Sequence, residues 1–167
     1  MKSNTDLKNI SIDKLAQDVV QSLKSKQKRV AFAESCTGGM VSAAITSVDG
    51  ASEVLDLSMT TYANWAKVKY TDVTDEMLNA HGAVSSETAL AMASGIRMTA
   101  DSDIGIGITG IAGPGGGSES KPVGTVYIGI DCGNSQSVEH FVFEGGRNEV
   151  REQTTKMALM ILKECAK

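Results

Sequence analysis

Nucleophilic and hydrogen-bonding side chains stand together in the segment Glu34-Ser35-Cys36-Thr37-Gly38-Gly39. The apolar run at about 29–34 predicts a strand, and the apolar spacing after it predicts a helix near 38–48. A strand-to-helix turn of this kind puts hydroxyl and thiol groups at the carboxyl end of a sheet and presents unpaired backbone N–H groups at a helix N-terminus. A nucleophile and an anion-binding site can therefore share one turn, which favours acyl or phosphate chemistry.

Ser35 would need a base, and the two histidines do not supply an obvious one. Neither His81 nor His140 sits in a glycine-rich turn, and His81 is interpreted as a helix terminator. Lysine is the other possibility, and Lys67 follows Tyr62 just past a predicted strand end. A lysine works as a base only when its pKa falls from about 10.4 toward neutrality through desolvation or a positive neighbour. Tyr62 would hydrogen-bond either partner.

Simpler interpretations of these side chains stay open. Lys67 fits a solvated surface charge, and Ser35, placed before Thr-Gly-Gly, fits a helix cap. Cys36 is a competing nucleophile because a neighbouring helix N-terminus lowers the pKa of a thiol. A small, buried packing role for Cys36 is the interpretation that we favour.

The composition predicts one globular domain over 11–167 after a flexible N-terminus at 1–10. Of the 167 residues, 41% are hydrophobic and 22% are charged, as in ordinary soluble domains. The net charge of −4, without a basic stripe, argues against nucleic-acid binding. No run approaches the roughly 20 apolar residues of a membrane span, and the first residues lack a signal peptide's apolar region. Three cysteines without metal spacing favour a reduced, cytoplasmic setting and give no metal site.

Helices and strands interleave along the chain, which predicts an α/β fold with a mixed sheet covered by helices on both faces. Helices are expected at 12–25, 38–48, 64–69, 74–80, from Ser85 or Ser86 onward, and at 147–165; strands are expected at 29–34, 54–62, 103–109, 123–131 and 137–143. The last two strands are expected to form a hairpin.

Glycines dominate one further region of the chain. Gly105 and Gly107 alternate with isoleucines in a predicted strand, so a helix or ligand can approach that face closely. The segment 105–110 matches G-x-G-x-x-G, but its glycines lie inside a strand, which rules out a dinucleotide fingerprint. The loop at 110–122 is the longest, and such loops in compact domains are usually functional or disordered.

Five motifs occur in order and resemble the CinA C-terminal domain family, which includes the nicotinamide-nucleotide amidases. They are Ala33-Glu34-Ser35-Cys36-Thr37-Gly38-Gly39, Tyr62-x-Asn64-x-x-Lys67, His81-Gly82-Ala83-Val84-Ser85, Thr109-Gly110-Ile111-Ala112-Gly113-Pro114-x-Gly116-Gly117 and Lys121-Pro122-Val123-Gly124-Thr125-Val126. The match spans about residues 11–165. One such motif would be weak, but five in order are highly specific.

The resemblance implies a three-layer α/β/α sandwich, a homodimer or larger homo-oligomer, and a stand-alone form of the domain. It also implies hydrolysis of nicotinamide mononucleotide to nicotinate mononucleotide and ammonia, a step of NAD recycling, without a cofactor. Ser35 maps to the nucleophile, with Lys67 and Tyr62 assisting.

The expected substrate contacts follow from the same resemblance. Backbone N–H groups of Thr37, Gly38 and Gly39 would hold the oxyanion, while the glycine-rich loop and Lys121 would receive ribose and phosphate. The expected substrate-binding residues are Thr37, Gly38, Gly39, Asn64, Thr109, Gly110, Gly113, Gly115, Gly116 and Lys121. The chain departs from the family around the lysine motif, as at Trp65, where an acid is usual. The alternative function is therefore a non-catalytic, nucleotide-binding or regulatory paralogue.

Overall fold

Secondary structure follows the predicted order along residues 10–166, the part of the chain that this computed structural model describes. The helices are α2 (Ile12–Lys26), α3 (Met40–Thr46), the 3₁₀ turn η1 (Ala51–Glu53), α4 (Asn64–Tyr70), α5 (Asp75–His81), α6 (Ser86–Ala100) and α7 (Arg147–Cys165). The strands are β1 (Val30–Glu34), β2 (Leu55–Thr60), β3 (Ile104–Gly110), β4 (Thr125–Asp131) and β5 (Gln136–Val142). The predicted flexibility of the first residues lies outside the described range, except at Ile10, which packs against the core.

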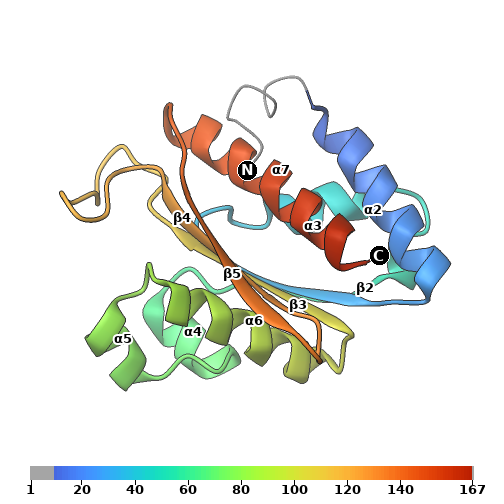
Figure 1. Cartoon of the computed structure of the whole chain (residues 1–167), viewed down its shortest axis with the longest axis horizontal. Helices are drawn as coiled ribbons and strands as arrows, with labels where there is room; N and C mark the ends of the chain where they lie inside the picture. The colour runs from blue at the N-terminus through green and yellow to red at the C-terminus, as the bar shows by residue number, and fades with distance from the viewer. Residues whose placement is uncertain (1–9, 167) are drawn as a thin grey trace.

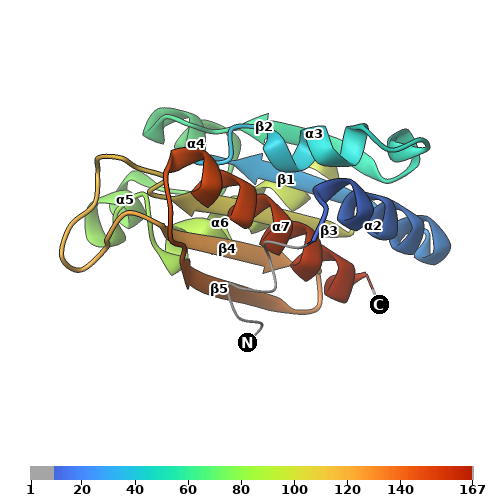
Figure 2. The same cartoon turned by 90° about the horizontal axis from the view of Figure 1, so that it is seen from above.

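One mixed sheet orders the five strands as β2-β1-β3-β4-β5. β1 runs parallel to both β2 and β3, so these three strands end at the same edge. β4 runs antiparallel to β3, and β4 and β5 form the predicted hairpin. Figure 2 shows this strand order from above, with α2, α3 and α7 lying over the sheet.

Helices cover both faces of the sheet, which confirms the predicted three-layer α/β/α sandwich. α2, α3 and α7 lie on one face, and α4, α5 and α6 lie on the other (Figure 1). The larger core forms under the first group, where Leu23, Phe32 and Leu159 are fully buried. A second core, which includes Met92 and Ile96, forms under α6.

The glycines of β3 let α6 lie directly on the sheet. A Cβ atom added to Gly105 would come 2.1 Å from the carbonyl oxygen of Ala93, and one added to Gly107 would come 2.3 Å from that of Ala89. No side chain fits at such distances. The prediction of close approach at this face is confirmed, and the approaching group is a helix.

Two expectations need correction. The helix predicted from residue 38 begins at Met40, because Gly38 and Gly39 take positive φ angles of 62° and 94° that lie outside helical geometry. The cysteines are not all reduced, because a disulfide joins Cys132, just after β4, to Cys165 at the end of α7. Spacing along the sequence did not indicate this pair, since 33 residues separate them.

Candidate active site

A cavity of about 290 Å³ lies at the carboxyl ends of β1 and β3. Its lining residues are Ser35, Cys36, Tyr62, Asn64, Lys67, Ala83, Val84, Thr109, Gly110, Ile111, Ala112, Gly113, Gly115, Gly116 and Arg147. Ligands of open α/β sheets bind outside the carboxyl ends of the strands, where successive connections diverge. The cavity therefore occupies the position in which this fold is expected to hold a ligand.

Lys67 and Ser35 meet in this cavity although 32 positions separate them. Their Nζ and Oγ atoms are 3.2 Å apart, so the predicted contact is present. The Lys67 ammonium position is also fixed by the backbone oxygens of Thr61, at 2.9 Å, and Tyr62, at 3.1 Å. Lys67 is 99% buried, which rules out the solvated surface charge considered from the sequence.

Burial makes the charged form of Lys67 less favourable than it is in water. Burial lowers the pKa of Lys67 from 10.5, because an ammonium loses hydration in the interior. A neutral amine has two N–H bonds and one lone pair. The carbonyls of Thr61 and Tyr62 can take the two N–H bonds, which leaves the lone pair for the hydroxyl hydrogen of Ser35. The arrangement matches that of a base beside its nucleophile.

Glu34 sets the geometry of the turn that carries Ser35. Its fully buried carboxylate accepts hydrogen bonds from the N–H groups of Gly39, Val41 and Ser42, at 2.9 to 3.2 Å. These are the groups that begin α3, so a side chain of the protein already fills this helix N-terminus. Sequence reasoning did not assign this role, although an acid at the end of an otherwise apolar strand was a usable signal.

Two of the three predicted oxyanion donors of this turn, the N–H groups of Gly38 and Gly39, are bonded within the protein. The N–H of Gly39 donates to Glu34, and the N–H of Gly38 donates to the backbone oxygen of Ser35, at 3.1 Å. Thr37 is fully buried, and none of these three residues lines the cavity. In this structure their backbone shapes the turn that carries Ser35.

Cys36 lines the cavity, but its environment disfavours ionisation of the thiol. The residue is buried, and desolvation raises the pKa of the thiol to about 12. A thiol with this pKa is almost wholly protonated near neutral pH and is a poor nucleophile. The buried role favoured from the sequence is consistent with this environment.

Arg147 is a lining residue that the sequence analysis missed. Its guanidinium donates to the carbonyl oxygen of Gly113, at 2.8 Å, and to the hydroxyl oxygen of Tyr62, at 3.0 Å. It therefore links the glycine-rich loop to the segment after β2, across 85 positions of sequence in the second case. A cation at the first position of α7 is unfavourable for the helix dipole, and this mismatch was the available signal.

The glycine-rich loop forms one wall of the cavity. Thr109, Gly110, Gly113, Gly115 and Gly116 all line it, as does Asn64. These six residues were expected from the sequence to bind the substrate, and all of them face the cavity.

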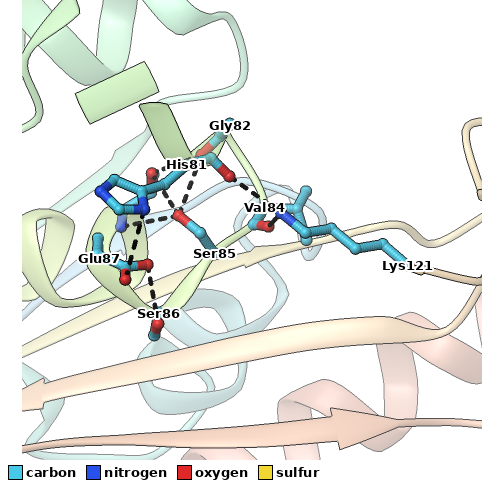
Figure 3. Close-up of polar contacts among 8 residues, drawn as sticks. His81, Gly82, Val84, Ser85, Ser86, Glu87 and Lys121 are labelled. Carbon is cyan, nitrogen blue, oxygen red and sulfur yellow. Dashed lines mark hydrogen bonds and ion pairs between the residues drawn. The ribbon is translucent and has the colours of Figure 1, made fainter. Parts of the chain in front are cut away.

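Lys121 departs from its expected place. It does not line the cavity, and its Nζ atom donates to the carbonyl oxygens of His81 and Val84, at 3.0 and 2.7 Å. The expectation that Lys121 receives a phosphate stays a prediction, and in this structure the ammonium is bonded to backbone carbonyls instead. Figure 3 shows the side chain reaching these two carbonyls.

Trp65 also lies outside the cavity. Its side chain is exposed, and its ring centroid lies 6.4 Å from that of Tyr70. Because the side chain is exposed and is not among the lining residues, Trp65 is part of the molecular surface.

Within residues 10–166, no helix is long and apolar enough to cross a membrane. The same range holds no cluster of three His, Cys, Asp or Glu side chains that could bind a metal ion. His81 ends α5, as predicted, with Gly82 at a φ angle of 79° just beyond it.

The family model of the CinA C-terminal domain matches residues 12–166. This chain belongs to the CinA C-terminal domain family. A relative from Moorella thermoacetica, whose name refers to competence-damage induction, is 50% identical over 140 residues, which are 84% of this chain and 34% of that protein. A CinA-like protein of Anaeromyxobacter is 46% identical over 151 residues, 90% of this chain and 37% of the relative. The CinA domain described here thus spans about a third of the length of these curated relatives.

Solved structures agree with this assignment. The crystal structure of the competence/damage inducible protein CihA from Agrobacterium tumefaciens is 38% identical, with a TM-score of 0.88, over 93% of this chain and 96% of that one. A CinA superfamily protein from Klebsiella pneumoniae is 31% identical, with a TM-score of 0.90, over 94% and 98% of the two chains. The α/β/α sandwich of this CinA domain is therefore the fold of known CinA structures.

Proposed function

We propose that this CinA domain is an amidohydrolase that converts nicotinamide mononucleotide and water to nicotinate mononucleotide and ammonia. The observation that carries the proposal is the buried Lys67 amine, 3.2 Å from Ser35 Oγ, with its pKa lowered by burial. The family membership supports the substrate class, because the resemblance noted from the sequence includes nicotinamide-nucleotide amidases.

In the proposed reaction, Ser35 Oγ attacks the carboxamide carbon while its proton passes to Lys67 Nζ. The tetrahedral intermediate then collapses: the carbon–nitrogen bond breaks, and the proton on Lys67 goes to the departing nitrogen, which leaves as ammonia. Water attacks the resulting ester and gives a proton to Lys67. That proton returns to Ser35 as the carboxylic acid product leaves, so the enzyme is restored.

Arg147 and Tyr62 are proposed to contact the phosphate and the ribose of the substrate. The Arg147 guanidinium donates two hydrogen bonds, to Gly113 and Tyr62, and its remaining N–H groups can donate to a phosphate oxygen. Tyr62 would then orient the arginine and border the ribose, a role that differs from the help to the base expected at first. A nucleotide monophosphate is favoured over an uncharged amide by this cation.

The test is ammonia release from nicotinamide mononucleotide by the purified chain. We expect Ser35→Ala to lower kcat by about 10³-fold or more, since the residual rate lacks the covalent route. Ser47→Ala is the matched control, because its hydroxyl bonds only the carbonyl of Ala44 within α3. Near-normal turnover by Ser35→Ala would show that Ser35 is not the nucleophile.

The non-catalytic alternative has its own outcome in the same experiment. If the unmodified chain releases no ammonia but binds pyridine or purine nucleotides, the cavity serves binding or regulation. Comparing a small panel of amides, with and without phosphate, also tests whether Arg147 selects the substrate.

A further inference from the structure

The segment between α5 and α6 is held by side chains at four consecutive carbonyls. It spans residues 82–85, the first of the four carbonyls belongs to His81 at the end of α5, and Ala83 and Val84 line the cavity. The carbonyl of His81 accepts from Lys121 at 3.0 Å, that of Gly82 from Ser85 at 3.1 Å and Thr88 at 2.8 Å, that of Ala83 from Thr109 at 2.6 Å, and that of Val84 from Lys121 at 2.7 Å. A cavity wall without regular secondary structure is thereby fixed.

Lys121 joins this wall to the glycine-rich loop, which also lines the cavity. Its own backbone closes a turn with Ser118: the N–H of Ser118 donates to the Lys121 carbonyl at 2.8 Å, and the N–H of Lys121 donates to the Ser118 hydroxyl at 3.1 Å. The backbone thus belongs to the loop, while the ammonium holds residues 81 and 84. The two walls cannot separate without breaking these ammonium–carbonyl bonds.

A second contact crosses the same segment. His81 Nδ1 lies 3.5 Å from the Glu87 carboxylate, so the end of α5 is also linked to the first turn of α6 (Figure 3). Both side chains are about half exposed, so this pair is screened by water and contributes little. Two side chains reach the wall from other parts of the chain: Lys121 donates to the carbonyls of His81 and Val84 from the glycine-rich loop, and Thr109 donates to that of Ala83 from the end of β3.

We propose that Lys121 is a positioning residue that sets the width of the cavity by holding the Ala83–Val84 wall against the glycine-rich loop. The apolar side chains of this wall offer a surface for the flat ring of the substrate in the same cavity as the polar Ser35 and Lys67. Lys121 therefore governs substrate affinity and ring selectivity without touching the reacting atoms. The expected effect of Lys121 on KM rests on the proposed function. Its expected effect on amide hydrogen exchange does not.

The structural consequence is tested by amide hydrogen exchange in Lys121→Met, which keeps the apolar stem and removes the ammonium. The N–H groups of Gly82 and Thr88 are bonded to Leu78 and Ser85 and report on opening of the segment. We expect about tenfold faster exchange at these two amides, with the β3 amides unchanged. Lys121→Arg, which keeps donors and charge, should restore protection, and Lys26→Met, an exposed lysine on α2, is the control for loss of charge.

The kinetic consequence is tested with the same variants and nicotinamide mononucleotide. We expect KM to rise about tenfold in Lys121→Met while kcat stays within about threefold, because the lost effect concerns ground-state and transition-state binding alike. Arginine should recover most of the loss. Unchanged exchange at Gly82 and Thr88, faster exchange throughout the domain, or an unchanged KM would each overturn the proposal. If the unmodified chain has no amidase activity, the proposed function fails while the exchange data still decide whether Lys121 holds the wall.

Discussion

Replacing Lys67 with methionine tests the base directly. The variant keeps most of the buried volume but removes the atom that lies 3.2 Å from Ser35 Oγ. A positioned general base contributes about 10²–10⁴-fold to rate, so we expect kcat to fall by about that factor. This corresponds to about 3–5 kcal/mol of activation free energy. Lys69→Met is the matched control, because its amine lies on the surface of the same helix, 5.3 Å from the Tyr70 ring centroid.

The pH dependence of kcat/KM in the unmodified protein tests whether Lys67 must be neutral to act. Lys67 acts as a base only when neutral, and burial lowers its pKa from 10.5. kcat/KM should therefore rise with pH until the pKa of Lys67 is reached and then level off below pH 10.5. On the acidic side of that pKa the rate should fall about tenfold for each pH unit. The measurement is ammonia release across buffers from about pH 6 to 10.

Stability has a matching pH dependence. Because the folded pKa of Lys67 is lower than the unfolded value, its charged form is disfavoured in the native state. The associated penalty is complete below the folded pKa and is relieved as pH rises toward 10.5, so the fold gains stability over that window. Lys67→Met should lack this rise in chemical denaturation. A flat pH–rate profile, together with near-normal turnover in Lys67→Met, would refute the reasoning.

Three further predictions concern neighbours of the dyad. Cys36→Ala should keep turnover within about tenfold in the ammonia assay, because the thiol, with a pKa of about 12, is not the nucleophile; a loss as large as that of Ser35→Ala would contradict this. Glu34→Gln should destabilise the fold by about 2–4 kcal/mol and lower Tm by roughly 5–15 °C, since an amide NH₂ would face backbone N–H donors; an unchanged Tm in calorimetry would count against the capping role. Trp65→Ala should change KM less than about twofold, because the ring is 65% exposed and outside the cavity, and a tenfold change would show that it reaches the substrate.

Much of the fold was predictable because its signals are local. Apolar spacing located the helices and strands within a few residues, and glycines marked the face of β3 on which α6 packs. The sharp end of α5 at His81 was also local, because the following glycine takes a positive φ angle. Helix boundaries were less accurate at residue 38, since the backbone of a glycine pair is not fixed by apolar periodicity.

The candidate site was predictable where a side chain and its motif lie next to a strand end. Ser35 follows β1 directly, and Lys67 lies in the first turn of α4, the helix after β2, so parallel strands bring both to one edge of the sheet. The spacing of residues along the sequence did not decide whether Lys67 contacts Ser35, because this contact forms only when α4 directs the Lys67 side chain inward.

Sequence alone determined the order of the elements, the glycine-lined strand and the edge of the sheet that carries Ser35. Only the tertiary structure decided which partners the charged side chains around the cavity bind. Glu34 occupies the N-terminus of α3, Lys121 holds carbonyls of a neighbouring segment, and Arg147 enters the cavity from the last helix. The physical reason is that a local pattern specifies backbone geometry, whereas the partner of a charged side chain depends on which distant segments the packing brings within about 3 Å of it.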